Sequence, residues 1–229
     1  MAQPSLRAEQ VEATRLAILA SARRLFGAHG YGATSIDDIA RDARVTKGAV
    51  YHHFETKDEL FRSVYVEVEA DAQARTARAT QLSSAPIDQL VHGMHAYLDT
   101  ALDPEVQRIT LIDAPSVLGP EPDGPAEEQP GHQGVREFVA EGIRTGAITK
   151  LDADAIAHVL RGSILQGALV IAHSPDPTAA RRRIGAVLEA MIRGLAPGGT
   201  DRARRSTTKA TRPKDSRGPI SGDPQRPSN

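Results

Sequence analysis

Apolar residues recur every three or four positions over most of the chain, which is the spacing of side chains on one face of an α-helix. The first such stretch runs over about 6–29 and ends at Gly30, a residue that commonly terminates helices. Later stretches begin after Thr46 and Thr56, whose hydroxyls can cap the free N–H groups of a helix. The pattern predicts helices at about 6–29, 34–43, 46–54, 57–80, 87–103, 104–118, 131–146, 152–173 and 177–195.

The composition favours the same all-α interpretation. Hydrophobic residues make up 40% of the chain and aromatic residues only 3%, with no tryptophan, so its helices pack through small aliphatic side chains. Because there is no cysteine, the chain has no disulfide framework and no thiolate metal site or nucleophile. The N-terminus lacks the apolar run of a signal peptide, and no stretch of about 18 uninterrupted apolar residues occurs. We therefore expect a cytoplasmic protein without a cofactor.

Charge is spread unevenly along the chain, although the formal net charge is only -1. Residues 63–196 carry 11 Lys or Arg against 18 Asp or Glu, whereas residues 197–229 carry 8 against 3. The last segment has almost no large apolar residue, so burial cannot offset the entropy of ordering it. We expect domains at 10–62 and 63–196 and a disordered basic tail at 197–229, which either adds salt-dependent attraction to phosphates or has no role. A proline-rich loop is expected at 119–131.

The two short helices at 34–43 and 46–54 are joined by a tight turn and carry apolar residues only where they face each other, which is typical of a helix-turn-helix. In that motif the second helix lies in the DNA major groove with its first residues at the base edges. There Lys47 can donate to guanine, and Thr46 can reach a base edge or its phosphate. Gly48 allows a close backbone approach. Double-stranded DNA is therefore the expected partner.

The residues around this second helix suit contacts to DNA phosphates. Thr34 lies at the start of the first short helix, where free N–H groups and the helix dipole favour an anion, and Lys57 begins the next long helix. The predicted DNA-binding residues are Thr34, Ser35, Thr46, Lys47, Gly48, Tyr51, His52, His53 and Lys57. The alternative is a generic three-helix packing unit in which Lys47 is merely solvated.

The segment YGATSIDDIARDARVTKGAVYHHFETKDELF, residues 31–61, resembles the DNA-binding domain of the TetR family. The resemblance rests on the combined spacing of Thr34, Ile39, Ala40, Ala43, Val45, Gly48, Tyr51, His53, Phe54, Lys57, Leu60 and Phe61. It implies that Tyr51 contacts phosphate or base and that Thr34, His53 and Lys57 contact the DNA backbone. It also implies an N-terminal three-helix helix-turn-helix DNA-binding domain followed by a helical ligand-binding and dimerisation domain.

Two later helices carry apolar residues on more than one side, so each needs more than one packing partner. The pair at 152–173 and 177–195 resembles the helices that form the four-helix dimer interface of TetR proteins, which predicts a homodimer and a near-palindromic operator. The predicted interface consists of Ile156, Leu160, Ile164, Gly167, Ile171, Ile184, Val187, Leu188 and Met191. The alternative is that these apolar stripes pack inside one monomer.

Polar and aromatic side chains set among aliphatic residues predict where a small-molecule effector binds, because ligand pockets are lined in this way. The candidates are Tyr65, His92, His95, Tyr97, Arg108, Asp113, Phe138 and Gln166. Since aromatic residues are scarce, we expect an aliphatic or mixed ligand. His92 and His95, with Asp99 a turn further on, could also hold a metal ion, but the sequence identifies no further ligand, so we expect no metal site.

The chain has no motif of an enzyme that we recognise: no Gly-rich phosphate loop, no Gly-x-Ser-x-Gly and no paired histidines flanking a glutamate. We expect instead a transcriptional regulator, a repressor that a small molecule of unknown identity releases from its operator. In the expected mechanism the effector shifts the helix at 57–80. This changes the distance between the two helices at 46–54, one from each protomer, that lie in the major groove. The alternative is an effector-independent architectural DNA-binding protein, which would not need so large a domain at 63–196.

Overall fold

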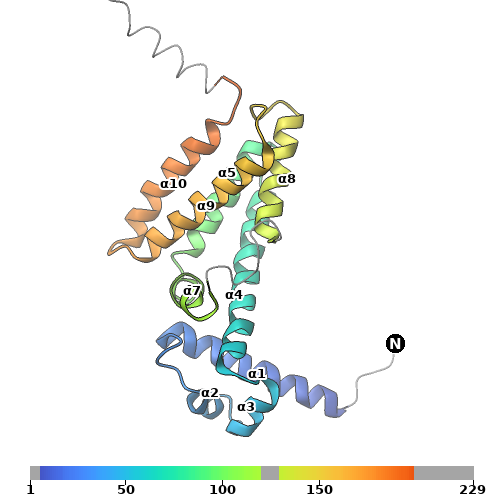
Figure 1. Ribbon diagram of the computed structural model, residues 1–229, viewed down its shortest axis with the longest axis vertical. Coiled ribbons are helices and arrows are strands. Elements are labelled where there is room, and N and C mark those ends of the chain that lie inside the picture. Colours follow the sequence, from blue (N-terminus) through green and yellow to red (C-terminus); the bar gives the residue numbers. More distant parts are fainter. Residues whose placement is uncertain (1–5, 120–128, 199–229) are drawn as a thin grey trace, which may run out of the picture.

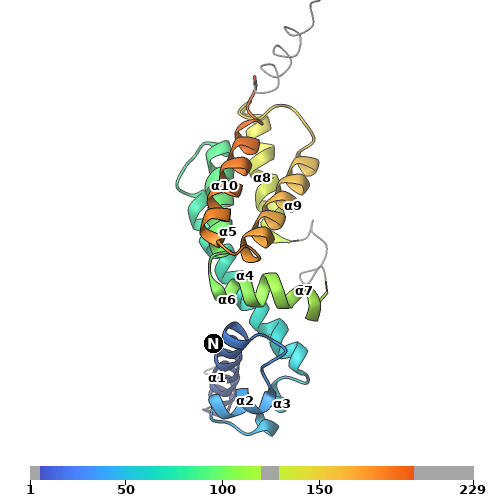
Figure 2. The same cartoon turned by 90° about the vertical axis from the view of Figure 1, so that its left-hand side faces the viewer.

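The computed structural model describes residues 6–119 and 129–198, and within these ranges the chain forms helices and no strand. The expected all-α fold is confirmed. In chain order the helices are α1 (Leu6–His29), α2 (Ile36–Asp42), α3 (Lys47–His53), α4 (Lys57–Thr80), α5 (Pro86–Thr100), α6 (Pro104–Val106), η1 (Gln107–Asp113), α7 (Ala114–Val117), α8 (Pro130–Arg144), α9 (Ala153–Ala172) and α10 (Pro177–Arg193). Figures 1 and 2 show α1, α2 and α3 at one end and α8, α9 and α10 at the other, with α4 running between them. Most of the predicted basic tail and of the predicted proline-rich loop lies outside the described residues.

Side-chain caps start three of the helices where the sequence indicated them. Ser35 caps α2 in a reciprocal capping box with Asp38. Thr46 and Thr56 cap α3 and α4 by accepting the backbone N–H three residues further on. The turn from α2 to α3 contains Arg44 in the left-handed region, with φ 58°. These boundaries are thus set by interactions within a few residues of each helix start.

The first hydrophobic core joins α1, α2, α3 and the first half of α4 to the segment from α6 to α7. At its centre the buried rings of Phe26 and Phe61 meet edge to face, with centroids 5.2 Å apart. Val106 and Ile109 come from the later segment and are buried in the same core. This core therefore extends beyond the predicted boundary at residue 62, and it ties the helix-turn-helix to residues far along the chain.

The expected helix at 104–118 contains a change of helical register. Between α6 and α7 lies the π-helical turn η1, in which the N–H of Ala114 donates to the carbonyl of Ile109, five residues earlier. Pro115 follows directly, and its ring has no N–H and crowds the carbonyl four residues before it. The wider turn ahead of this proline accommodates that crowding.

The second hydrophobic core is formed by α5, α8, α9 and α10 around residues such as the fully buried Leu98. Two glycines permit close contacts in this core. A Cβ on Gly142 of α8 would lie 2.5 Å from Cδ1 of Ile148, which is in the turn that follows α8, and one on Gly167 of α9 would lie 2.8 Å from Cγ2 of Ile184 on α10. The return of the chain after α8 and the approach of α9 to α10 thus depend on the absence of side chains at these positions.

Among the described residues, α9 is the one helix long and apolar enough to cross a membrane by length and composition. A core helix of a soluble protein passes the same test, so this is weak support for a membrane span. In the structure α9 packs against α5, α8, α10 and η1, and 33% of its apolar window is buried.

Candidate DNA-binding and ligand-binding sites

The first turn of α3 is the exposed part of the helix-turn-helix. Val50 and Phe54, at 0% and 2% exposure, anchor α3 on the first core. Thr46, Lys47 and Gly48 are exposed, and α2 and α3 lie at the end of the molecule far from α10 (Figure 2). This arrangement can present the start of α3 to a duplex while its buried side holds its orientation fixed.

Lys47 is paired with a carboxylate of the neighbouring helix. Its Nζ lies 3.0 Å from Oδ2 of Asp37 on α2. The hydrogen bond to Asp37 raises the pKa of Lys47, so the ammonium stays charged. Both side chains are more than half exposed, at 53% and 59%. Such a pair contributes little to stability, so a guanine edge can displace the carboxylate at small cost.

The other candidates on α3 share this accessible surface. Tyr51 is 46% exposed, His52 is exposed and His53 is half-buried. The two imidazole rings meet edge to face with centroids 5.4 Å apart. Ser35, at the start of α2, is also exposed. These side chains are therefore placed where contacts with a DNA backbone are sterically possible.

Thr34 and Lys57 both have hydrogen-bond partners within the protein. Thr34 is 2% exposed, and its hydroxyl donates to the carbonyls of Gly30 at 2.9 Å and Leu25 at 3.2 Å. The Lys57 ammonium donates to the Tyr31 carbonyl at 2.6 Å and lies 3.9 Å from the centre of the Tyr31 ring, and burial lowers the pKa of Lys57. The single hydroxyl hydrogen of Thr34 is therefore used at the end of α1 and the turn after it, whereas the Lys57 ammonium satisfies the Tyr31 carbonyl and has further N–H donors.

Comparison with known proteins relates both halves of the chain to one family. Residues 18–64 match the family described as "Bacterial regulatory proteins, tetR family". Residues 87–195 match the one described as "Tetracyclin repressor-like, C-terminal domain". A solved TetR-family transcriptional regulator from Pectobacterium atrosepticum is 33% identical, with 82% of this chain and 97% of that chain covered and a TM-score of 0.74. The chain belongs to the TetR family of transcriptional regulators.

Other relatives cover less of the chain or are more distant. The Transposon Tn10 TetC protein of Escherichia coli is 33% identical over 111 residues, which is 48% of this chain and 56% of TetC. This chain thus matches little more than half of the length of that curated relative. A solved gamma-butyrolactone receptor is 24% identical, with 88% of this chain and 96% of that chain covered, and its TM-score of 0.58 shows a shared fold.

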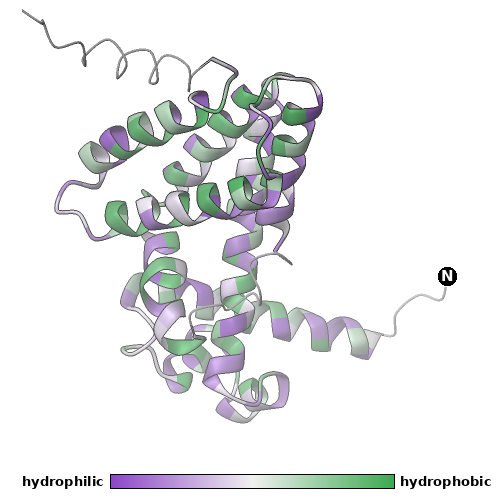
Figure 3. Ribbon diagram, turned by 45° about the horizontal axis from the view of Figure 1, so that its top comes forward, coloured by the Kyte–Doolittle hydropathy of each residue, from purple (hydrophilic) through white to green (hydrophobic). Residues whose placement is uncertain are grey.

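The TetR-family protein exposes apolar side chains on α9 and α10. Val159 and Val170 on α9 are 58% and 48% exposed, and Val187 and Met191 on α10 are 60% and 44% exposed. Figure 3 shows hydrophobic residues along both helices. These four residues, which we call the α9–α10 apolar face, are uncovered in the single chain.

Most of the predicted interface residues do not belong to this face. Val187 and Met191 do, and Ile164 and Ile184 are half-buried. The buried ones are Ile156, Leu160, Gly167, Ile171 and Leu188. In the single chain these five residues are buried, which is the packing inside one monomer that the alternative interpretation describes.

The predicted effector residues do not gather at one cavity. Tyr65 belongs to the first core. Asp113 in η1 accepts a hydrogen bond from the backbone N–H of Tyr31 at 2.7 Å, and the Arg108 side chain lies against Gly30. These three candidates therefore lie in the first core or beside the turn after α1. We call α1, α2, α3 and the first half of α4 the head and the helices around the second core the body, so these residues lie at the junction between head and body.

The remaining effector candidates lie in or beside the second core. Tyr97 and Phe138 pack against it, His92 is half-buried on α5, and Gln166 on α9 is exposed. His95 places Nε2 2.9 Å from Glu189, and its Nδ1 lies 2.9 Å from the Arg181 guanidinium. Both ring nitrogens are thus engaged, which leaves none for a metal ion in this conformation. Residue type alone could not show which of these polar side chains line a cavity and which pair with other residues.

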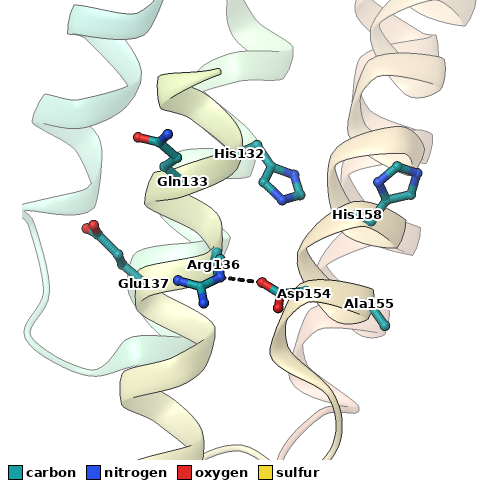
Figure 4. Close-up of a pocket in the computed structure, with 7 residues that line it drawn as sticks. All are labelled: His132, Gln133, Arg136, Glu137, Asp154, Ala155 and His158. Carbon is teal, nitrogen blue, oxygen red and sulfur yellow. Dashed lines mark hydrogen bonds and ion pairs between the residues drawn. The ribbon is translucent and has the colours of Figure 1, made fainter. Parts of the chain in front are cut away.

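An open cavity of about 520 Å³ lies between α8 and α9 (Figure 4). We call it the α8–α9 groove; it is lined by His132, Gln133, Arg136, Glu137, Asp154, Ala155 and His158. None of these was predicted as an effector residue. The signal that could have found them is a pair of polar residues four positions apart on each helix, because such pairs share one helix face.

Arg23 on α1 is another residue that the sequence did not single out. Its guanidinium forms two hydrogen bonds with Glu105 of α6, at 3.0 and 2.8 Å, and an ion pair with Asp71 of α4 at 2.8 Å. The hydrogen bond to Glu105 is the main cause that raises the pKa of Arg23, with Asp71 contributing less. Since Glu105 is 82 positions away in the chain, no local pattern could reveal the contact. One side chain therefore joins three elements at the junction of head and body.

Proposed function

We propose that this protein is a sequence-specific repressor that binds a near-palindromic operator as a homodimer and is released by a small molecule. The observation that carries DNA binding is the exposed first turn of α3 on a helix anchored by Val50 and Phe54. Membership of a regulator family supports the same function. The proposed site of action is the cytoplasm.

In the proposed complex each α3 reads one half-site in the major groove. Lys47 exchanges Asp37 for guanine, Thr46 and Gly48 approach the neighbouring base or phosphate, and Tyr51 contacts the backbone. Thr34 contributes indirectly, by holding the turn after α1, and Lys57 both holds that turn and contacts the DNA backbone with its remaining N–H donors. In this complex the first turn of α3 discriminates between DNA sequences, whereas the residues around it add affinity for any sequence.

The proposed homodimer is formed by the α9–α10 apolar face. Packing it against its two-fold copy would give a four-helix interface and would remove four large apolar side chains from water. We expect Val187→Glu and Met191→Glu each to shift the protein towards monomer in sedimentation at equal concentration. Val66→Glu is the matched control, since Val66 is 54% exposed but lies on α4. A dimer unaffected by both α10 substitutions would exclude this interface.

Release by an effector needs a connection between body and head. The segment α6–η1–α7 is buried in the first core with α1 and α4, and η1 also contacts α9. A ligand that moves α9 can therefore move η1 and the head with it. To weaken operator binding by about 2.7 kcal/mol, the effector must prefer the released form about 100-fold.

The first experiment is selection of bound duplexes from a random library by the full chain. We expect a palindromic motif, and we expect Lys47→Ala and Tyr51→Ala to lose it. Lys150→Ala is the control, because Lys150 is an exposed lysine of the second domain. Recovery of no motif would contradict the proposed function and favour an architectural DNA-binding protein.

The second experiment measures the separation of the two heads. Because the chain has no cysteine, a single Glu12→Cys substitution on the exposed side of α1 gives one spin label in each protomer. We expect the label-to-label distance to differ between the operator complex and the protein released by a ligand. Release with an unchanged distance would exclude the proposed head movement.

A further inference from the structure

The α8–α9 groove contains a histidine with an unused hydrogen-bonding atom. His132 comes from the first turn of α8, is 3% exposed and lines the groove. Within residues 6–119 and 129–198 its Nδ1 is buried and has no hydrogen-bond partner. In Figure 4 the ring lies in the space between α8 and α9, and its centroid is 6.2 Å from that of His158. An unpaired polar atom beside a cavity can pair with a bound molecule.

An unpaired buried nitrogen is unfavourable for the folded protein, because it has lost its contact with water and gained nothing in return. Neutral imidazole accepts at one nitrogen and donates at the other. A ligand hydroxyl can satisfy Nδ1 in either tautomer, since a hydroxyl both donates and accepts. The cavity volume of about 520 Å³ lies within the range of small-molecule sites.

Charge at the opening of the groove limits the class of ligand. Arg136 of α8 and Asp154 of α9 are hydrogen-bonded across it (Figure 4), and their charges cancel. Glu137 adds one negative charge at the rim. An anion would have to break the Arg136–Asp154 pair and approach Glu137, whereas an amine or hydroxyl can donate to the carboxylates with the pair intact.

We propose that the α8–α9 groove is the effector site and that the effector is a small molecule rich in hydroxyl or amine groups with no net negative charge. This inference rests on the proposed function for its regulatory meaning, but the binding site itself does not. The groove is also well placed for regulation. His158 precedes Val159 of the α9–α10 apolar face, and α9 contacts η1, so a ligand wedged between α8 and α9 can affect both the dimer and the head.

The first test is ligand-observed NMR of the full chain with three sets of small probes of similar size: polyols, amino alcohols and hydroxycarboxylates. The variants are His132→Phe, which keeps a ring but removes the nitrogens, and Ala155→Phe, which fills the groove from an exposed position on α9. Two substitutions outside the groove serve as controls. His173→Phe replaces an exposed histidine at the other end of α9, and Ala70→Phe replaces an exposed alanine on α4.

We expect polyols or amino alcohols to bind, both groove variants to weaken that binding about tenfold or more, and neither control to do so. We also expect His132→Phe to raise the melting temperature without ligand, because it removes an unpaired polar atom. Binding by hydroxycarboxylates alone, binding that survives both groove variants, or no binding in any set would overturn the proposal. A lower melting temperature for His132→Phe would contradict the unpaired nitrogen on which it rests.

A DNA-binding assay with the same probes separates this inference from the proposed function. If a probe binds in the groove and releases the selected operator, both the effector site and the proposed function are supported. If it binds there and leaves DNA affinity unchanged, the groove is not the effector site, while repression remains supported by the operator itself. If no operator can be selected at all, the proposed function fails, and the NMR result alone then decides whether the groove binds ligands.

Discussion

The junction made by Arg23 offers a quantitative test of how the head is attached to the body. Replacing Arg23 with alanine removes two hydrogen bonds to Glu105 and one ion pair to Asp71. The two interactions differ in their surroundings. The Arg23 and Glu105 side chains are 25% and 30% exposed, whereas Asp71 is 53% exposed.

These exposures set the expected energies. A hydrogen bond to a charged group contributes about 1.5–3 kcal/mol, and solvent around a partly exposed pair keeps the Arg23–Glu105 coupling near the lower end, at about 1.5–2 kcal/mol. The Arg23–Asp71 pair resembles a surface ion pair, which contributes about 0.2–1 kcal/mol. The Glu105 interaction should therefore be the stronger by about 1 kcal/mol.

Two double-mutant cycles measure this difference. One combines Arg23→Ala with Glu105→Ala, and the other combines Arg23→Ala with Asp71→Ala, each followed by urea unfolding at one fixed protein concentration. The fixed concentration matters because the stability of the proposed dimer depends on it. A spin label introduced by Glu12→Cys on the head of each protomer adds a structural measurement, and its distance distribution should broaden when Arg23 or Glu105 is removed.

The reasoning is refuted if the coupling to Glu105 falls below about 0.5 kcal/mol or does not exceed the coupling to Asp71. An unchanged distance distribution would show that Arg23 adds stability without orienting the head. In that case α4 and the shared apolar core alone would connect the head to the body.

Three further predictions concern single positions. Gly142→Ala should cost about 1–3 kcal/mol, because the new Cβ would lie 2.5 Å from Ile148 Cδ1, and this cost should be smaller when it is measured in an Ile148→Ala background by thermal unfolding. Burial, aided by Asp58, raises the pKa of Tyr31 from 10.0 to about 12, so the folded state holds the phenol proton more tightly. The resulting stabilisation should be present below pH 10 and be lost as the pH rises through about 12, and Tyr31→Phe should abolish this part of the pH dependence in denaturant titrations. Ser35→Ala should cost about 1 kcal/mol by removing the α2 cap, and an unfolding midpoint equal to that of the parent protein would contradict this.

The sequence by itself determined the helices and the exposed start of α3. Helix positions follow from apolar spacing and from caps such as Ser35, Thr46 and Thr56, and these act over three or four residues. The exposure of Thr46 and Lys47 follows in the same way, because the apolar side of a short helix fixes which residues are left outside. Local information was sufficient wherever the deciding partner is a near neighbour in the chain.

The tertiary structure decided which partner each remaining side chain meets. An apolar stripe on α9 or α10 shows that something covers it, but only packing shows that Leu188 faces its own core while Val187 faces outward. The fold alone brings Lys57, which was predicted to contact phosphate, to the Tyr31 carbonyl. The contact of Arg23 with Glu105 likewise joins residues 82 positions apart. The type of a residue indicates which kind of partner it requires, but the partner that it contacts is decided by the folding of the whole chain.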